Sequence, residues 1–385
     1  MCLRDGNPTE RVNRTDGPIT LRKNITSREN DNLQMRTFNL NKYLLAGFVA
    51  LAAFSCSGNV YYDPDKDHHT KKGFKTKTDR SFTDWLSMRF REGDYPSIGK
   101  EKAQTILGEA DIKKINSPAN VPRVTWVGHA TVLVQYKGIN YLTDPHLTDY
   151  PGPSKLFAPE RITPPALSFE ELPKIDFVLI SHSHYDHLDS RTVDMIGNSV
   201  KWYVPLGLKS WFLDQDIVAE KIVELDWWDS DNFSENVKIT FTPNIHWSRR
   251  TLWDSNKSLW GSWSVQIADF KSWFAGDTGY DEQLFKRIGK KQGPFDLAII
   301  PIGTYGPRYF MLPMHVDPDQ AVLIHKDVRS KKSIPVHWGT FQLSYEPFLE
   351  PRALLVEALK KNELQEDQFN SIKIDETVEL KNFSE

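Results

Sequence analysis

The sequence predicts an α/β protein in which two β-sheets pack face to face and helices cover their outer faces. Short strand-like runs alternate with helix-like segments over most of the chain from residue 121 onward. Two runs, 177–180 and 297–300, are apolar at every position, which is typical of strands buried on both faces. Histidines and aspartates follow several of these runs directly. This alternation suits layered sheets with helices outside.

The predicted elements follow one another along the chain. Three strands come first, at 123–127, 131–136 and 139–143, and Lys137-Gly138 supplies a tight turn. The later predicted strands are 177–180, 202–204, 238–242, 262–267, 272–275, 297–300 and 334–336. The predicted helices are 192–196, 208–213, 282–288, one that begins at Asp317, and 352–359.

The helix after Asp317 has clear start signals. The Asp317 carboxylate is suited to cap the helix, and Pro318 stands in the first turn, where its missing N–H costs nothing. Gln320 occupies the position that completes a capping box. We therefore expect a helix with both halves of that box.

Composition narrows the class of protein. At 385 residues the chain can bury a large core, and 39% hydrophobic with 26% charged residues is ordinary for a soluble globular protein. A net charge of −3 shows no basic excess, so nucleic acid is not an expected partner. Cys2 and Cys56 both precede the predicted body, which argues against a structural disulfide and a cysteine-ligated zinc site.

The N-terminus resembles a processing signal. Residues 1–34 are polar and aperiodic, as expected for disorder or for a start codon placed too early. Residues 35–56 contain Arg36, Lys42 and the apolar run 43–54, which is short for a membrane span. This is the pattern of a signal peptide.

Cys56 stands directly after the apolar run, which resembles a bacterial lipoprotein signal. Phe54 and Ala53 depart from that pattern, so simple secretion and an uncleaved anchor remain alternatives. Lipidation of Cys56 would place the protein in the cell envelope, on the periplasmic or extracellular side. Residues 57–80 are polar, as in a flexible tether, and we expect His68 and His69 to be solvated there.

The motif that carries chemistry is SHSHYDHLD at residues 181–189, directly after the apolar run 177–180. Three histidines and one aspartate lie within positions 182–187. Imidazole and carboxylate are good zinc ligands. Without a metal ion, so many polar groups packed together would lack partners. The alternative, solvated loop histidines, fits a lone histidine better than this cluster.

More ligands are needed, because one short turn cannot fill two tetrahedral sites. Each of three further candidates follows a predicted strand: His246 after 238–242, Asp277 after 272–275 and His337 after 334–336. Taken alone, Asp277 between two glycines is also typical of a turn. Together with the histidine cluster, the three form a coherent set.

This set resembles the metallo-β-lactamase superfamily. That family uses His-x-His-x-Asp-His, then a later His, a bridging Asp and a final His, and all seven positions are filled here in order. The resemblance implies an αβ/βα sandwich with two zinc ions. The implied ligands are His182, His184 and His246 for one zinc ion, Asp186, His187 and His337 for the other, and Asp277 for both.

Other segments resemble one branch of that superfamily. Residues 128–131 and 143–145 resemble lactonase-like and phosphodiesterase-like members. Five segments closely resemble the N-acyl-phosphatidylethanolamine-hydrolysing phospholipases D: 256–265, 274–280, 301–303, 315–318 and 332–341. The likeness extends from about residue 82 to about residue 359 and leaves out the N-terminal signal.

The resemblance implies a lipid phosphodiesterase that releases an N-acylethanolamine and phosphatidic acid. Two zinc ions would activate a shared water, with iron or manganese as alternative metals. His315 would orient the phosphate or protonate the leaving oxygen, or else be structural. Asp144, His129 and Asp189 would fix ligand imidazoles or be turn and core residues.

Membrane contact is the expected partnership. The Pro-rich loop 151–165, with Leu156 and Phe157, would dip into a bilayer beside the site or form a rigid surface loop. A lipid anchor would favour the former. The family implies a homodimer. We expect His146 and His325 to be structural.

Two other functions remain open. One is hydrolysis of a soluble phosphodiester or lactone on the same fold, because fold alone does not decide the substrate. The other is lipid binding with an inactive metal site, which the complete ligand set argues against. A true β-lactamase is disfavoured, because the resemblance lies elsewhere in the superfamily.

Overall fold

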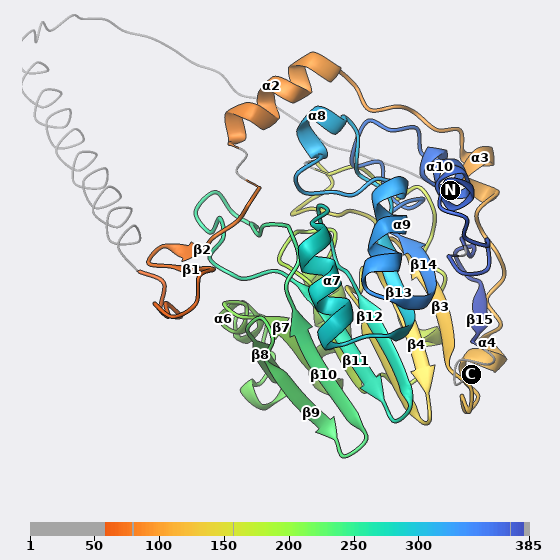
Figure 1. The fold of residues 1–385 in the computed structure, drawn as a ribbon, viewed down its shortest axis with the longest axis horizontal. Helices are drawn as coiled ribbons and strands as arrows, with labels where there is room; N and C mark the ends of the chain where they lie inside the picture. Colours follow the sequence, from red (N-terminus) through yellow and green to blue (C-terminus); the bar gives the residue numbers. More distant parts are fainter. Residues whose placement is uncertain (1–57, 79–80, 157, 370, 381–385) are drawn as a thin grey trace, which may run out of the picture. The chain divides into compact units, whose positions relative to one another are not determined.

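Two β-sheets form the centre of the computed structural model (Figure 1), which describes residues 58–78, 81–156, 158–369 and 371–380. The predicted signal peptide, Cys2 and Cys56 lie outside these residues. Contacts group residues Asn59–Glu385 into one unit. The predicted α/β sandwich is confirmed by this arrangement.

The first sheet has seven strands and is mixed. In spatial order the strands are β15 (Thr377–Glu379), β3 (Arg123–Gly128), β4 (Thr131–Tyr136), β5 (Ile139–Thr143), β6 (Phe177–Leu179), β7 (Lys201–Pro205) and β8 (Ile222–Leu225). Strands β5 to β8 run parallel to one another, whereas the other neighbouring pairs are antiparallel.

The second sheet has six strands, of which the last three in the chain are parallel. In spatial order they are β14 (Ser330–Val336), β13 (Phe295–Pro301), β12 (Phe270–Phe274), β11 (Ser262–Ile267), β10 (Val237–Thr242) and β9 (Ser230–Ser234). The polar strand β9 alternates between exposed and half-buried residues at the sheet edge, and its lack of an apolar run explains why the sequence did not predict it.

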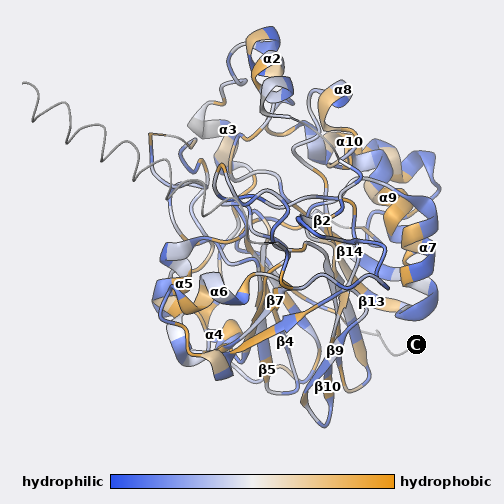
Figure 2. Cartoon of the chain, turned by 90° about the vertical axis from the view of Figure 1, so that its left-hand side faces the viewer, coloured by the Kyte–Doolittle hydropathy of each residue, from blue (hydrophilic) through white to orange (hydrophobic). Residues whose placement is uncertain are grey.

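Helices cover both outer faces (Figure 2). On one side lie α4 (Ile112–Ile115), α5 (Ser190–Ile196) and α6 (Lys209–Leu213). On the other side lie α7 (Glu282–Lys291), α9 (Pro318–Asp327) and α10 (Glu350–Lys361). The remaining α-helices and strands are α2 (Phe82–Glu92), α3 (Lys100–Gln104), α8 (Arg308–Met311), β1 (His69–Thr70) and β2 (Gly73–Phe74).

The helix predicted after Asp317 is α9, but its capping box is incomplete. The Asp317 carboxylate accepts a hydrogen bond from the Gln320 amide at 2.9 Å, as expected. The Gln320 side chain instead accepts from Arg308 at 2.8 Å. A tertiary contact with α8 therefore replaces the local half of the box, which corrects that expectation.

Aromatic side chains fill the space between the sheets. Four tryptophans of the larger buried cluster are less than 2% exposed: Trp126, Trp260, Trp263 and Trp273. A second buried cluster lies under α4, α5 and α6. The buried run of β6 contacts both clusters, because alternate residues point to opposite faces of its sheet. This placement holds the end of β6 rigidly.

Residues 59–78 are not a free tether, which corrects the expectation for this stretch. β1 and β2 form a small hairpin whose Phe74 amide donates to the Asn256 carbonyl at 2.8 Å. His69 is only 7% exposed. A polar composition misled the prediction, because these polar groups find partners on the body instead of in water.

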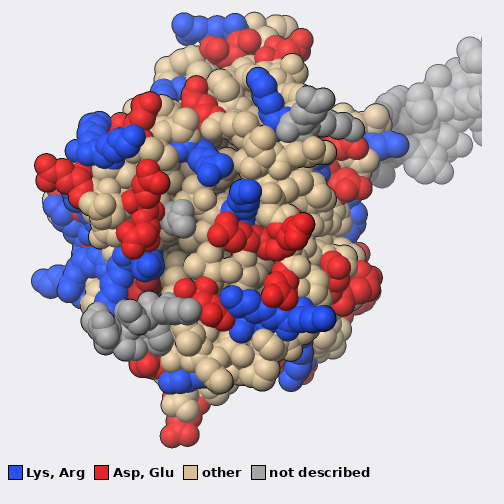
Figure 3. Space-filling view, turned by 90° about the vertical axis from the view of Figure 1, so that its right-hand side faces the viewer, with Lys and Arg blue, Asp and Glu red and all other residues tan. Residues whose placement is uncertain are grey.

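The surface carries both signs of charge. Lysine and arginine are interspersed with aspartate and glutamate on the face shown in Figure 3. Within the described ranges, no helix is long and apolar enough to span a bilayer.

Asp375 provides a test of stability against pH. It lies at φ 80°, and burial, with a smaller effect of Glu171, raises its pKa from 3.8 to about 6. Because the folded pKa is raised, this group stabilises the fold most below about pH 4, and that contribution is lost as the pH rises towards 6.

Asp375→Asn is therefore expected to raise the Tm at pH 7 by about 2 °C, for about 1 kcal/mol after allowance for solvent screening of a half-buried group. The gain should shrink at pH 4. Asn tolerates positive φ, so the backbone is not strained. Asp216→Asn is the control, because Asp216 is exposed at φ 59°. Equal shifts in the two variants would contradict the prediction.

Candidate metal centre

The candidate ligands gather where strands of both sheets end. The segment 181–189 follows β6, His246 follows β10, Asp277 follows β12 and His337 follows β14. Parallel strands end at one edge of a sheet, so β12 and β14 deliver their following loops to the same side. The two packed sheets then bring these loops and the segment after β6 together.

The first group of ligands consists of three imidazoles. His182 Nε2 lies 2.8 Å from His184 Nδ1, and His246 Nε2 lies 3.2 Å from the same His184 nitrogen. The His246 Nδ1 atom donates a hydrogen bond to the Met314 carbonyl at 3.0 Å. In a neutral ring its Nε2 therefore carries a lone pair, which points at the other two imidazoles. Three lone pairs that converge in this way fit one cation.

The second group consists of two imidazoles and a carboxylate. His337 Nε2 lies 3.2 Å from Asp186 Oδ2 and 3.1 Å from His187 Nε2. The His187 ring is 0% exposed on its side chain, and its other nitrogen donates to Asp144 Oδ2 at 2.6 Å. The free nitrogen of His187 therefore faces the site.

Asp277 lies between the two groups. Its Oδ2 is 3.1 Å from both His187 Nε2 and His337 Nε2 and 3.9 Å from His246 Nε2. Among the described residues, its buried Oδ1 has no hydrogen-bond partner. One oxygen shared by both groups and one left unpaired fit a carboxylate that bridges two cations. The structure thus brings all seven predicted ligands together.

The electrostatics of the site fit bound cations. Burial lowers the pKa of His246 to about 4, so its ring is neutral and able to ligate at pH 7. Burial also acts to lower the pKa of His337, but Asp277 and Asp186 outweigh it and raise the value to about 9. The two carboxylates therefore attract positive charge, which a metal ion would supply in place of protons.

Four of the five ligand imidazoles are oriented by a second contact, as metal-binding histidines usually are, whereas the second nitrogen of His184 has no hydrogen-bond partner among the described residues. Ser181 Oγ lies 2.9 Å from His182 Nδ1, and Thr304 Oγ1 lies 3.1 Å from His337 Nδ1. Sequence reasoning missed Thr304, although its place shortly after the predicted strand 297–300 was a signal of the same kind as for the other candidates. It missed the Met314 carbonyl because a backbone group leaves no mark in a sequence.

His315 and His129 lie at the edge of the ligand set. His315 Nδ1 is 3.8 Å from Asp277 Oδ2 and, within the described part of the chain, has no hydrogen-bond partner. Burial lowers its pKa to about 3, so the ring is neutral at pH 7. His129 Nε2 lies 3.0 Å from Asp186 Oδ2, where it is placed to orient that carboxylate.

Asp189 does not contact a ligand imidazole, which corrects the expectation for this residue. Its carboxylate caps α5 through the Thr192 amide at 3.3 Å and accepts from the Thr148 hydroxyl at 2.7 Å. His146 is buried beside Phe341, and His325 pairs with Ser333 at 2.8 Å. Asp189 ends the ligand motif and also precedes α5, so the sequence alone cannot tell whether it caps the helix or orients a ligand histidine.

The N-terminal hairpin supports one ligand. Thr76 Oγ1 donates to the His246 carbonyl at 2.7 Å, and Thr78 Oγ1 donates to the same oxygen at 3.3 Å. Nothing in the sequence pairs residues 170 positions apart. The segment expected to be a tether therefore helps to hold His246.

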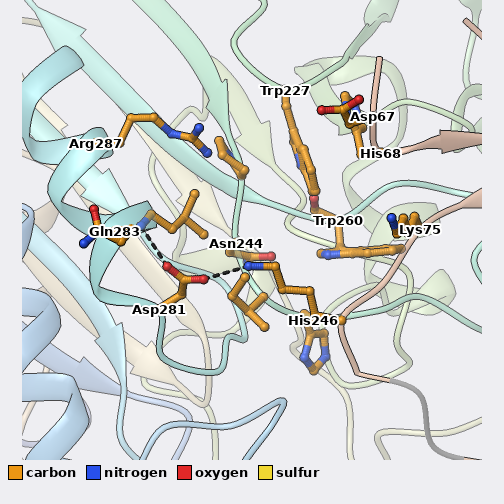
Figure 4. A pocket seen from close by; sticks show the side chains of 14 residues that line it. Asp67, His68, Lys75, Trp227, Asn244, His246, Trp260, Asp281, Gln283 and Arg287 are labelled. Atoms are coloured by element: carbon orange, nitrogen blue, oxygen red, sulfur yellow. Dashed lines mark hydrogen bonds and ion pairs between the residues drawn. The ribbon is translucent and has the colours of Figure 1, made fainter. Parts of the chain in front are cut away.

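A pocket of about 580 Å³ adjoins this side of the site (Figure 4). Trp227 and Trp260 supply aromatic walls, and Lys75 and Arg287 supply positive charge. Of the seven proposed ligands, His246 alone lines it. The residues 243–246, which directly follow β10, form part of its lining.

Asp144→Asn tests the orienting contact behind His187. Asp144 accepts from His187 Nδ1, from the Ser181 amide at 2.7 Å and from the Ser181 hydroxyl, so all its partners are donors. An amide group cannot accept from all three. We expect metal affinity to fall about 10–100-fold, measured by competition with a chelator. The control is Asp231→Asn, in the edge strand β9 of the second sheet, whose carboxylate accepts from the Tyr203 hydroxyl; it should leave metal affinity unchanged.

Comparison with known proteins agrees with this geometry. The protein-family model described as the beta-lactamase superfamily domain matches residues 140–338. The chain is 44% identical over 321 residues to N-acyl-phosphatidylethanolamine-hydrolyzing phospholipase D 1 of Caenorhabditis elegans, covering 77% of this chain and 90% of the relative. It is 39% identical over 238 residues to the mitochondrial enzyme of that name from Saccharomyces cerevisiae, covering 60% of this chain and 50% of that protein.

Solved structures show the same fold at low identity. An isothiocyanate hydrolase from Delia radicum gut bacteria superposes with a TM-score of 0.55 at 19% identity, over 66% of this chain and 98% of that one. The ligand geometry, the matched domain and the identity to the worm protein agree. The chain therefore belongs to the metallo-β-lactamase superfamily and, within it, to the family of N-acyl-phosphatidylethanolamine-hydrolysing phospholipases D.

Proposed function

We propose that this chain is a dinuclear zinc phosphodiesterase that hydrolyses N-acyl-phosphatidylethanolamine to N-acylethanolamine and phosphatidic acid. One observation carries the proposal. The Asp277 carboxylate stands between two groups of imidazoles, in a chain 44% identical to a protein named for this reaction. Two imidazole-rich groups with a shared carboxylate favour zinc over harder cations.

When bound, the two cations would supply Lewis acidity and lower the pKa of a water molecule. The protein's share is to hold the ligands and exclude water. Asp277 is 2% exposed, and without metal ions His187 and His337 outweigh the effect of burial and hold its pKa well below the usual range; bound cations would keep it charged in the same way. It is therefore placed to accept a hydrogen bond from the attacking water.

His315 is placed to bind the phosphate. Its neutral ring lies beside Asp277, and its carbonyl is held by Arg308 Nη1 at 2.8 Å. We assign its N–H to a phosphoryl oxygen. The oxygen of water forms a new bond to phosphorus, the bond from phosphorus to the ethanolamine oxygen breaks, and a proton from the water ends on that oxygen.

Exposed apolar side chains on two loops support contact with a membrane. Leu252 and Trp253 are 74% and 76% exposed, on a loop that Arg250 ties to the ligand segment through the Ser183 carbonyl at 2.9 Å. Leu156, in the predicted loop 151–165, is 81% exposed. Phe157 lies outside the described residues. We propose that these loops touch the bilayer and that a lipid on Cys56 keeps the enzyme on the outer side of the cell membrane.

The double variant Leu252→Ser, Trp253→Ser is expected to bind vesicles about tenfold more weakly, because two large apolar side chains no longer leave water. Co-sedimentation with phosphatidylethanolamine vesicles measures this, and a water-soluble short-chain substrate should be turned over normally. Cys56→Ser should release the protein from the membrane fraction of expressing cells. The control Leu213→Ser changes an exposed leucine on α6. Equal binding by wild type and the double variant would refute the loop proposal.

The function is tested with the full-length chain in detergent micelles, after its metal content has been measured. N-Acyl-phosphatidylethanolamine is incubated in water enriched in ¹⁸O, and the products are followed by mass spectrometry. We expect N-acylethanolamine and ¹⁸O-labelled phosphatidic acid, with neither product from His184→Ala. Diacylglycerol would show that the other phosphorus–oxygen bond breaks and would contradict the proposal.

No turnover by a protein that carries about two zinc ions would also overturn the proposed substrate. In that case a soluble phosphodiester or a lactone becomes the preferred substrate, and panels of both classes would be assayed. A protein that folds but binds no zinc would favour lipid binding with an inactive site.

A further inference from the structure

A second cluster of ligand-type side chains lies outside the catalytic set. It consists of His68, His69 and Asp226, whose ligand atoms all lie within 4.8 Å of one another. His68 Nε2 is 2.7 Å from Asp226 Oδ1, and His69 Nε2 is 2.9 Å from Asp226 Oδ2. Asp226, directly after β8, is 2% exposed. Two imidazoles from the N-terminal hairpin thus converge on one buried carboxylate of the body.

The contacts of His69 direct its Nε2 at the Asp226 carboxylate. Its Nδ1 lies 2.8 Å from the Tyr61 carbonyl, to which it can only donate. The Asp63 amide N–H points at the same nitrogen at the longer distance of 3.2 Å, as a competing donor. With Nδ1 protonated, a neutral ring turns the lone pair of Nε2 towards the Asp226 carboxylate. Two acceptors that face each other at 2.9 Å must share a positive charge, which either a proton on Nε2 or a metal ion supplies.

The catalytic ligands provide a comparison within the same structure. Their nitrogens lie 2.8–3.2 Å apart, close to the 2.7 and 2.9 Å separations of this cluster. His246 also donates Nδ1 to a backbone carbonyl at 3.0 Å and presents Nε2, as His69 does. A ring held by a carbonyl on its far side is the usual arrangement for a metal-binding histidine.

We propose that His68, His69 and Asp226 bind a third, structural zinc ion. Two imidazole nitrogens and a carboxylate oxygen are zinc ligands, and water would complete a tetrahedron. His68 stacks on Trp227 at 4.3 Å between ring centroids, which fixes its ring (Figure 4). Lys66 Nζ contacts Asp226 Oδ2 at 2.5 Å and can stay there as an outer partner of the ligating carboxylate.

Such an ion would fasten the hairpin that supports the catalytic site. The hairpin supplies His68 and His69 and continues to Thr76, whose hydroxyl donates to the carbonyl of His246. Binding to the folded state alone stabilises that state. The third ion would therefore hold Thr76 in place beneath a catalytic ligand without taking part in hydrolysis.

The test counts metal in the full-length protein, in detergent micelles, after loading with zinc and dialysis against a weak chelator. Mass spectrometry of the metal should give about three zinc ions per wild-type chain and about two in His69→Gln. Lys66→Met should keep all three, because lysine is not a ligand. His325→Gln is the matched control, because that buried ring pairs with Ser333 away from both clusters.

Anomalous diffraction at the zinc edge, on wild-type crystals, locates the ions and needs no variant. Signal is expected at His68, His69 and Asp226 as well as at the catalytic set. Signal at the catalytic set alone would overturn the proposal, as would equal zinc contents in wild type and His69→Gln. The proposal would also be overturned if the wild type carried only two zinc ions and Lys66→Met were less stable. In that case salt bridges alone would fasten the hairpin. None of these readouts depends on phospholipid turnover, so failure here leaves the proposed function untouched.

Discussion

Asp277→Asn is expected to lower kcat/KM for N-acyl-phosphatidylethanolamine by about 10³-fold, for a loss of about 4 kcal/mol in transition-state stabilisation. The Asp277 Oδ2 atom is shared between His187, His337 and His246 at 3.1–3.9 Å. An amide has the same shape but no charge and only one acceptor atom. It cannot bridge two cations, so at least one should be lost.

The measurement pairs steady-state kinetics with metal content. Zinc should fall by about one ion per chain in the purified variant. Asp281→Asn is a matched control, because Asp281 follows the same strand, caps α7 and pairs with Lys77 at 2.7 Å without contacting the ligands. Activity within tenfold of wild type in Asp277→Asn, with full zinc, would exclude a bridging role.

Trp263→Ala is expected to cost about 4 kcal/mol of unfolding free energy. Trp263 is 0% exposed between the sheets and packs on Phe241 at 4.5 Å between ring centroids. Its removal leaves a large cavity. Its Nε1 also donates to the Ile180 carbonyl at 2.9 Å, directly before the ligand segment, and that buried carbonyl would lose its partner.

Chemical denaturation measures this loss, and zinc affinity reports its effect on the site. Trp263→Phe separates the two contributions, because phenylalanine fills most of the space but cannot donate to Ile180. We expect it to recover more than half of the stability while zinc binding stays weakened. A cost below about 1 kcal/mol for Trp263→Ala would contradict this stabilising role of the indole.

The sequence by itself determined the fold class and which histidines and aspartates are candidate ligands. Buried strands such as 177–180 are visible because every position is apolar, and the ligand segment 181–189 follows at once. The spacing of histidines and aspartates depends on local chain order, which a sequence displays directly. For the same reason the predicted hairpin turn appears, with Lys137 at φ 48° and Gly138 at φ 79°.

Only the tertiary structure decided which polar groups serve the site and which serve the fold. Asp189 caps α5 and Asp144 orients His187, yet both are aspartates close to the motif or to a strand end. Thr76 reaches the carbonyl of His246 across 170 positions. Hydrogen bonds between distant segments depend on how the sheets pack, and no local pattern encodes that packing. For the same reason, the polar composition of residues 59–78 resembled a tether, although in the folded protein these residues form a hairpin that contacts buried groups of the body.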